Sequence, residues 1–248
     1  MPTLTPPLRQ YLAITGCYWL FTITDGALRM LVVLHFHNLG YNPLQIAFMF
    51  LFYEAFGVVT NLVGGYLGAR IGLNKTMNLG LVLQVLALVM LLVPVELLSV
   101  AWVMAAQALS GIAKDLNKMS AKSSIKYLVP NNAESSLFKW VSILTGSKNA
   151  LKGVGFFLGA LLLSAWGFQF SIGTLVALIV FALVISTMML STDISRAKHK
   201  PKFTQAYSRS KAINTLSAAR LFLFASRDVW FVVGLPCLLY TSPSPRDS

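Results

Sequence analysis

The chain has 248 residues, of which 56% are hydrophobic and 11% are charged, and its mean hydropathy is +0.69. Because soluble domains are about 25% charged, this composition excludes a soluble enzyme, a disordered tail and a secreted disulfide scaffold, for which two cysteines are also too few. The net charge of +12 would suggest nucleic acid in a soluble protein, but in a membrane protein it indicates cytoplasmic loops rich in Lys and Arg. We therefore expect an all-α, polytopic membrane helical bundle whose partner is the lipid bilayer and not nucleic acid.

Six apolar segments are long enough to cross the hydrocarbon core of a membrane, which takes about 20 residues in a helix. They cover residues 11–34, 44–67, 77–95, 98–117, 137–166 and 168–190, and a seventh begins near Ala212. The outer links are short, such as Gly167 between the fifth and sixth segments, so consecutive helices are predicted to be antiparallel neighbours. The first segment is too long for a cleavable signal peptide.

Lys and Arg alternate between the two sides of these segments. They occur before the first segment and after the second, fourth and sixth segments, whereas the links after the first, third and fifth contain neither residue. The basic residues are Arg9, Arg70, Lys75, Lys118, Lys122, Lys126, Lys139, Arg196, Lys198, Lys200, Lys202, Arg209 and Lys211. Because basic loops stay in the cytoplasm, this alternation predicts a multi-pass protein of the inner (plasma) membrane with a cytoplasmic N-terminus.

Three charged residues lie inside the first two segments, where each costs at least a few kcal/mol unless it is paired or faces water. Asp25 and Arg29 are four residues apart on one helix face, so they are able to pair. Such a pair is either an internal ion pair that fixes packing or part of a polar translocation path. Glu54 is an isolated carboxyl group and is either a proton carrier or a hydrogen-bonded structural acid. Asp25 and Glu54 are therefore the candidates for proton coupling.

The fourth segment ends with two lysines on one face, Lys114 and Lys118. Asp115 lies beside them and is expected to neutralise them in part. A lysine near a helix end also extends its ammonium group to the membrane surface. Lys118 is therefore assigned to the interface, and Lys114 is the better candidate for an internal site.

The fifth segment carries two lysines at mid-membrane depth. At a rise of 1.5 Å per residue from Lys139, Lys148 lies about 13 Å deep and Lys152 about 20 Å. They share one helix face, Asn149 lies next to Lys148, and this helix offers no carboxyl group to pair with them. Such lysines need an anion or a water-filled cavity, so Lys148, Lys152 and Asn149 are predicted to bind substrate.

The deep charges of the whole bundle have a positive sum. Arg220 of the seventh segment adds to this set, which comprises Arg29, Lys114, Lys148, Lys152 and Arg220 against Asp25, Glu54 and Asp115. Such a site selects anions, and both the forked guanidinium of Arg and the point charge of Lys suit phosphate-like oxyanions.

The remaining motifs predict packing and not chemistry. Gly155 and Gly159 form a GxxxG motif, which favours close helix contacts. Two histidines separated by one residue, His35 and His37, are more typical of polar surface than of a metal site. With no nucleotide-binding loop, metal-ligand cluster or catalytic triad in the sequence, we expect no cofactor, no metal and no enzyme activity.

The composition divides the chain into four parts. Residues 1–190 form a six-helix bundle, residues 191–211 a basic cytoplasmic linker, and residues 212–236 the start of a second bundle. The polar tail at 237–248 contains a Ser-Pro-Ser-Pro run, which cannot continue a membrane helix, and residues 237–247 match the translation of a sequencing-library adapter. We therefore expect residues 237–248 to be a sequencing artefact. The biological sequence would then stop near Pro236, within a truncated seventh span.

The loop that begins at Gly65 resembles the loop signature of the major facilitator superfamily, G-x-x-x-D-R-x-G-R-R/K. Gly65, Arg70 and Gly72 match, Ala69 replaces the acidic residue, and the basic end is reduced to Lys75. The resemblance implies a plan of six plus six helices and assigns the matching residues to a conformational loop.

Four longer runs resemble ArsJ, the family of organoarsenical efflux transporters in that superfamily. They are residues 23–37, 106–126, 145–159 and 217–233, within a resemblance that covers nearly all of residues 8–236. This resemblance implies export of 1-arseno-3-phosphoglycerate, a compact polyanion that forms when a glyceraldehyde-3-phosphate dehydrogenase uses arsenate. It thereby implies arsenate resistance and this dehydrogenase as a functional partner. We expect antiport by alternating access in a complete protein that is monomeric.

Two alternatives stay open beside this interpretation. The first is a transporter of another phosphorylated or anionic metabolite, because the deep lysines do not distinguish among oxyanions. The second is a non-transporting membrane fragment with a structural or regulatory role.

Overall fold

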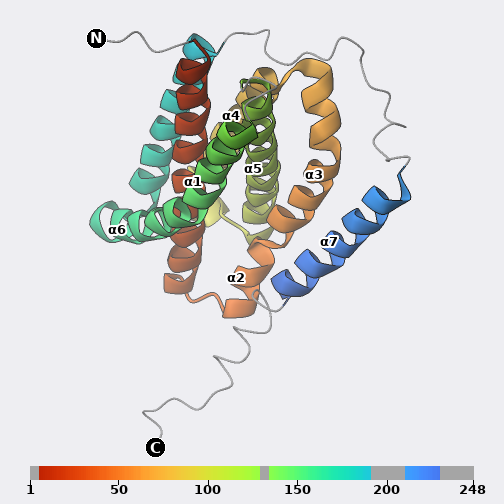
Figure 1. Cartoon of the computed structure of the whole chain (residues 1–248). Helices are drawn as coiled ribbons and strands as arrows, with labels where there is room; N and C mark the ends of the chain where they lie inside the picture. The colour runs from red at the N-terminus through yellow and green to blue at the C-terminus, as the bar shows by residue number, and fades with distance from the viewer. Residues whose placement is uncertain (1–5, 129–133, 191–209, 230–248) are drawn as a thin grey trace, which may run out of the picture. The chain divides into compact units, whose positions relative to one another are not determined.

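The fold is all-α in the part of the chain that the computed structural model describes, residues 6–128, 134–190 and 210–229 (Figure 1). Six helices and one 3-10 turn lie in residues 6–190, and a further helix, α7 (Lys211–Val229), belongs to a second unit that begins at Lys202. The elements of the first unit are α1 (Pro6–Asn38), α2 (Pro43–Met49), α3 (Leu51–Ile71), α4 (Leu73–Met90), η1 (Val95–Leu97), α5 (Val100–Leu128) and α6 (Glu134–Met189).

These helices confirm the predicted polytopic bundle of six segments and the start of a seventh. The fifth and sixth segments appear as two arms of α6 that meet at Gly167, whose φ of 74° lies in the left-handed region that only glycine adopts without strain. Among the described residues, four helical stretches are long and apolar enough to cross a membrane, namely Leu8–Asn38, Pro43–Asn61, Leu73–Met90 and Ser135–Met189, and the last of these contains both arms. α5 is 29 residues long but more polar, because it carries the charges of the site described below.

Two predicted segments differ in detail from the structure. The second segment is broken at Phe50, between α2 and α3. The short helix α2 has its own start signal, because Asn42 and Gln45 form a capping box and Pro43 occupies the first turn. The helix of the fourth segment does not end at Asn117, because α5 continues to Leu128 for about three further turns. Ala121, Ile125 and Leu128 are buried along this extension at helical spacing, a signal that the search for long apolar runs passes over.

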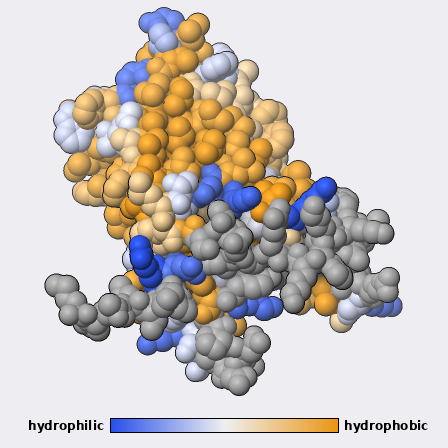
Figure 2. Space-filling view, turned by 90° about the horizontal axis from the view of Figure 1, so that it is seen from above, coloured by the Kyte–Doolittle hydropathy of each residue, from blue (hydrophilic) through white to orange (hydrophobic). Residues whose placement is uncertain are grey.

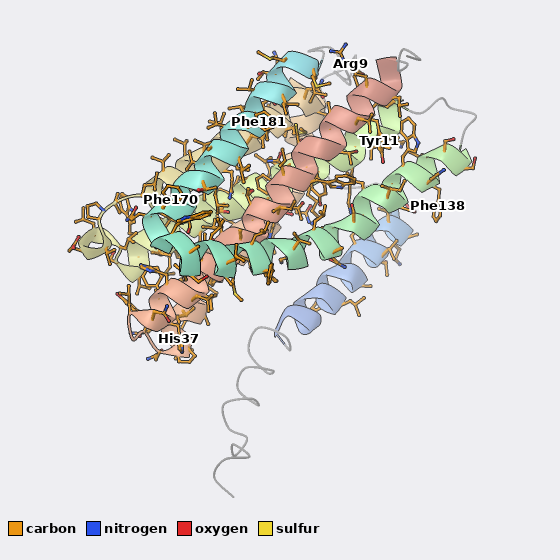
Figure 3. All side chains as sticks on the ribbon, turned by 90° about the vertical axis from the view of Figure 1, so that its left-hand side faces the viewer. Arg9, Tyr11, His37, Phe138, Phe170 and Phe181 are labelled. Atoms are coloured by element: carbon orange, nitrogen blue, oxygen red, sulfur yellow. The ribbon has the colours of Figure 1, made fainter. Side chains whose placement is uncertain are left out.

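The bundle is held together by two sets of contacts. α1 packs most extensively against α6, α5 packs against α4 and α3, and further contacts of α1 with α5 and of α4 with α6 join the two sets. The second arm of α6 lies along α1, with Phe181 closer than Phe170 to the Arg9 end of that helix (Figure 3). α4 and α5, which the short link at 91–99 joins, pack against each other as the neighbours that the sequence predicted.

Large apolar side chains lie outside as well as inside this bundle. Phe157, Phe170, Phe181 and Met188 of α6 are all exposed, and hydrophobic residues cover a broad part of the surface seen in Figure 2. An exposed apolar surface of this kind is expected for helices that face lipid.

Small residues set the distance between α1 and α6. A Cβ at Gly155 would lie 2.4 Å from the carbonyl oxygen of Ile23, and one at Gly159 would lie 2.5 Å from that of Ala27. From the side of α1, a Cβ at Gly26 would lie 2.7 Å from the carbonyl oxygen of Lys152. The GxxxG motif therefore brings the two backbones together, and the predicted close packing is confirmed.

This packing gives a stability prediction. Gly155→Ala and Gly159→Ala should each lower the free energy of unfolding by about 1–3 kcal/mol, because the added methyl group has to push two helix backbones apart. Gly173→Ala is the matched control in α6, since a Cβ there meets no atom within 4 Å in the described residues. It should be neutral or stabilising by up to about 1 kcal/mol. Thermal unfolding of the purified variants in detergent measures all three, and equal effects at the three positions would contradict the prediction.

Candidate functional site

Three helices meet at the carboxylate of Glu54. The side chain of Glu54, in α3, accepts a hydrogen bond of 2.6 Å from Nη2 of Arg29 in α1, and its second oxygen lies 3.4 Å from Nζ of Lys114 in α5. The side chains of Arg29 and Lys114 are 21% and 19% exposed, whereas that of Glu54 is 46% exposed. Glu54 is thus a bridge between the cations of two other helices.

This arrangement corrects one prediction and leaves an expected pair unformed. Glu54 is not an isolated carboxyl group, because it pairs with Arg29 and Lys114. The prediction missed these partners because residue spacing within one helix does not show contacts between helices. Asp25 and Arg29 share a face of α1, but Asp25 accepts a hydrogen bond of 2.5 Å from the hydroxyl of Tyr53, and Arg29 pairs with Glu54. Asp25 is 5% exposed. Its partner is thus the neutral hydroxyl of Tyr53 and not a cation.

Tyr53 is the residue of this site that the sequence did not reveal. Its side chain is fully buried, and its ring centroid lies 4.0 Å from the guanidinium carbon of Arg29 and 4.0 Å from Nζ of Lys114. Cations attract the face of an aromatic ring at this distance. One tyrosine in an apolar run carries no sequence signal of such a role, and only its position next to Glu54 points to it.

The end of α5 contains an ion pair of its own. Lys118 lies 3.1 Å from Asp115, so Asp115 neutralises Lys118 more directly than Lys114. Asp115 is 5% exposed, and Gly57 of α3 makes room for it, because a Cβ at Gly57 would lie 2.7 Å from a carboxylate oxygen of Asp115. Lys114 is therefore free to contact Glu54, and of the two lysines it is the internal one.

Lys148 and Lys152 lie on the first arm of α6 next to these groups. Lys148 is repelled by Lys114 and Lys118 and attracted by Asp25, while Lys152 is repelled by Arg29, Lys114 and Lys148 and attracted by Asp25. Neither lysine makes an ion pair or a side-chain hydrogen bond with the described residues. The nearest aromatic group to Lys152 is the ring of Phe156, 5.6 Å from its Nζ. The predicted pair of lysines is thus close to the other deep cations and lacks a carboxylate partner among the described residues.

The rotation of α6 that places these lysines is fixed by contacts with α1. The indole N–H of Trp19 donates a hydrogen bond of 2.9 Å to the hydroxyl of Ser147, the residue before Lys148. The backbone at Lys152 rests against Gly26. Asn149, in contrast, is exposed, and its predicted role stays untested.

Comparison with known proteins identifies the family. Residues 14–243 match the Major Facilitator Superfamily. The chain belongs to this superfamily of membrane transporters. None of the curated proteins matches the chain in sequence.

Solved structures of the superfamily share this fold. A mutant of the peptide transporter POT in complex with sulfate is 16% identical, with a TM-score of 0.58 over 96% of this chain and 47% of its own length. A bacterial homologue of the human drug peptide transporters is 15% identical, with a TM-score of 0.61 over 94% of this chain and 56% of its own length. The chain therefore spans about half the length of the transporters it resembles, and at this identity the likeness concerns the fold alone.

The superfamily loop lies between α3 and α4. Gly72 separates the two helices with a φ of 98°, and its N–H bonds the carbonyl oxygen of Gly68 at 3.0 Å. Arg70 donates a hydrogen bond of 2.8 Å to the hydroxyl of Tyr66, one turn earlier in α3. Gly65 and Lys75 are both exposed. The structure therefore explains the glycine of the turn, while the role of this loop in a conformational change stays a prediction.

Other predicted features lie outside the site or outside the described residues. Arg220 belongs to α7 in the second unit, and its side chain is not among those described, so its place beside the lysines stays a prediction. Most of the linker at 191–211 and the whole tail at 237–248 are likewise not described. No group of three His, Cys, Asp or Glu residues able to hold a metal occurs in the described residues. His35 stacks on Phe168 with ring centroids 4.0 Å apart, which is a packing contact.

The cluster formed by Asp25, Arg29, Tyr53, Glu54, Lys114, Lys148 and Lys152, hereafter the cationic cluster, has a clear chemical character. Four of its members are cations and two are carboxylates. Nε of Arg29 is also buried without a hydrogen-bond partner among the described residues. The cluster therefore offers positive charge and unused N–H donors, which is the chemistry that binds oxyanions.

The bridge at Glu54 gives a second prediction. Glu54→Gln should lower the free energy of unfolding by about 1 kcal/mol, because Arg29 and Lys114 lose their counter-charge while Glu54 itself is half-exposed. Added phosphate should then raise the unfolding temperature of the variant more than that of the unmodified protein, since it supplies the missing anion. Glu96→Gln, in the exposed turn η1, is the matched control. Equal responses of both variants to phosphate would contradict the prediction.

Proposed function

We propose that the transporter containing this chain exports a small anionic organoarsenical, 1-arseno-3-phosphoglycerate, and thereby confers arsenate resistance. Two independent arguments support the proposal. The sequence resembles organoarsenical efflux transporters over residues 23–37, 106–126, 145–159 and 217–233, and the cationic cluster has the charge that such a polyanion requires.

One observation carries most of this proposal. Lys148 and Lys152 lie near Arg29 and Lys114 and have no carboxylate partner among the described residues. Like charges held together in an apolar bundle are costly, and an anion bound among them removes that cost. An ion pair that served packing alone would bring equal numbers of opposite charges together.

The roles of the cluster residues follow from their partners. We assign Lys148 and Lys152 to the phosphate or arsenate oxygens, with Arg29, Lys114, Arg220 and Asn149 assisting. Asp25 and Glu54 are the candidates for the coupling proton of an antiport. Asp25 is the stronger candidate of the two, because its hydrogen-bond partner is the phenol of Tyr53, whereas two cations hold Glu54 as a carboxylate.

The cellular arrangement completes the proposal. The alternation of basic loops supports a location in the inner membrane with the N-terminus in the cytoplasm. In that orientation a cytoplasmic glyceraldehyde-3-phosphate dehydrogenase is the functional partner, because it forms the exported acyl arsenate from arsenate. Transport is assigned to alternating access, in which two six-helix halves of a monomer rock about a midplane site.

A transport assay tests the two lysines. Everted membrane vesicles that hold the transporter are given arsenate, glyceraldehyde-3-phosphate, NAD and the dehydrogenase, and arsenic uptake is measured. Lys148→Ala and Lys152→Ala should each reduce uptake at low substrate concentration by about 10-fold to 100-fold, since each removes a charged hydrogen bond to the ligand. Lys126→Ala, at the exposed end of α5, is the matched control and should transport normally. Undiminished uptake by both α6 variants would reject the assigned site.

The same vesicles separate the organoarsenical from other substrates. Arsenic uptake that requires both arsenate and the active dehydrogenase supports the proposal. Uptake of another phosphorylated metabolite, with arsenic uptake absent, would assign the transporter to that metabolite. Vesicles that move neither class of anion would favour a non-transporting role.

A further inference from the structure

Tyr53 contacts three charged groups of the cationic cluster at once. Its hydroxyl donates a 2.5 Å hydrogen bond to Asp25, and its ring lies 4.0 Å from the charged groups of both Arg29 and Lys114. Those two cations are also the partners of the neighbouring carboxylate, Glu54. Tyr53 therefore lies at the centre of the α1, α3 and α5 parts of the cluster.

The backbone at Tyr53 is held in place by α5. A Cβ at Gly111 would lie 2.2 Å from the carbonyl oxygen of Tyr53 and 3.0 Å from its Cα. This contact is possible only because residue 111 has no side chain. Lys114 is one helical turn after Gly111 on the same helix, so the close approach brings its ammonium group over the ring of Tyr53.

An aromatic ring and a carboxylate hold a cation in different ways. A carboxylate neutralises the cation that it binds, whereas a ring attracts the cation through its quadrupole and leaves the net charge unchanged. Asp25 is four residues before Arg29 and is the carboxylate on the same face of α1. The hydroxyl of Tyr53 donates a hydrogen bond to Asp25, and the ring of Tyr53 lies against the guanidinium group of Arg29.

We propose that Tyr53 is a positioning residue that keeps Asp25 from forming a direct ion pair with Arg29 and so leaves N–H groups of Arg29 available to the transported anion. This inference rests on the proposed function, because it assumes that an oxyanion binds in the cationic cluster. It assigns to Tyr53 an effect on the affinity for anions that is transmitted through Asp25. It also explains why two groups with the spacing of a helical ion pair, Asp25 and Arg29, take other partners.

The test compares single and double variants in the binding of 3-phosphoglycerate, a stable phosphorylated part of the proposed substrate. In Tyr53→Phe the ring stays but Asp25 is released to pair with Arg29, so 3-phosphoglycerate should bind about tenfold more weakly, the loss of one charged hydrogen bond. Asp25→Asn alone is the reference for the double variant, because it removes a negative charge that attracts the two lysines. Tyr53→Phe combined with Asp25→Asn should bind within about twofold of Asp25→Asn alone, because asparagine cannot form an ion pair with Arg29. Binding is measured by calorimetry on the purified transporter in lipid nanodiscs.

Controls make the result specific to this tyrosine. Tyr11→Phe, also in a buried position, removes a hydroxyl that donates to the carbonyl oxygen of Trp140 at 3.3 Å, away from the cluster. It should leave the affinity unchanged. If Tyr53→Phe alone does not fold, the comparison of the double variant with Asp25→Asn carries the test. The two should bind equally, because the hydroxyl has no carboxylate left to hold, and weaker binding by the double variant overturns the inference.

The outcomes separate this inference from the proposed function. Unchanged affinity in Tyr53→Phe, or weaker binding by the double variant than by Asp25→Asn alone, overturns the role of Tyr53, while loss of binding in Lys148→Ala in the same assay leaves the proposed site standing. Absence of 3-phosphoglycerate binding in the unmodified transporter overturns the proposed site, and the inference with it. Weaker binding by Tyr53→Phe, together with equal binding by the double variant and Asp25→Asn, supports both.

Discussion

A charge inside a membrane bundle needs a counter-charge, water or a polar partner, and in this protein that constraint fixes how α1, α3 and α5 face one another. Glu54 of α3 lies between Arg29 of α1 and Lys114 of α5. Rotating any of these helices by a quarter turn would leave at least one charge in lipid without a partner. The glycine contacts act in the same direction, because Gly111 permits α5 to reach Tyr53 and Gly57 makes room for Asp115.

The first arm of α6 is held by a different interaction and contributes a different chemistry. Gly155 and Gly159 bring its backbone against α1, and Ser147 accepts a hydrogen bond from Trp19. These contacts involve small or neutral residues and use none of the charge of the arm. Lys148 and Lys152 are therefore fixed in place without being neutralised, which is the arrangement that a site for an anion requires.

Features governed by composition and short spacing were predictable from the sequence. Apolar run length predicted the six segments, Gly167 predicted the turn between the arms of α6, and the GxxxG spacing of Gly155 and Gly159 predicted a close contact. Each of these signals lies within one helix or one link, so a single stretch of sequence contains it. The nearness of Lys148 and Lys152 to one another was predictable for the same reason.

Features that depend on which helices meet were not predictable in this way. Spacing within α1 permits Asp25 to pair with Arg29. It contains no information about Tyr53, which lies in α3 and donates a hydrogen bond to Asp25. Glu54 likewise has no partner at helical spacing in its own segment, because Arg29 and Lys114 lie on other helices. The capping box at Asn42 starts α2, whereas no side-chain cap marks the start of α3 at Phe50, so the break inside this apolar run has no local signal in the sequence.

The unequal charge of the cationic cluster bears on how a transporter of this kind would work. If the carboxylates matched the cations in number, an anion would have to break an ion pair for every new contact, and much of its binding free energy would be lost in doing so. Here Glu54 bridges Arg29 and Lys114, Asp25 is hydrogen-bonded to Tyr53, and Lys148 and Lys152 have no carboxylate partner among the described residues. Since an excess of cations is unfavourable in an apolar bundle, an anion bound there would stabilise the cluster as a whole. That stabilisation couples the anion to four helices at once, which is the kind of coupling that a change between inward-open and outward-open states requires.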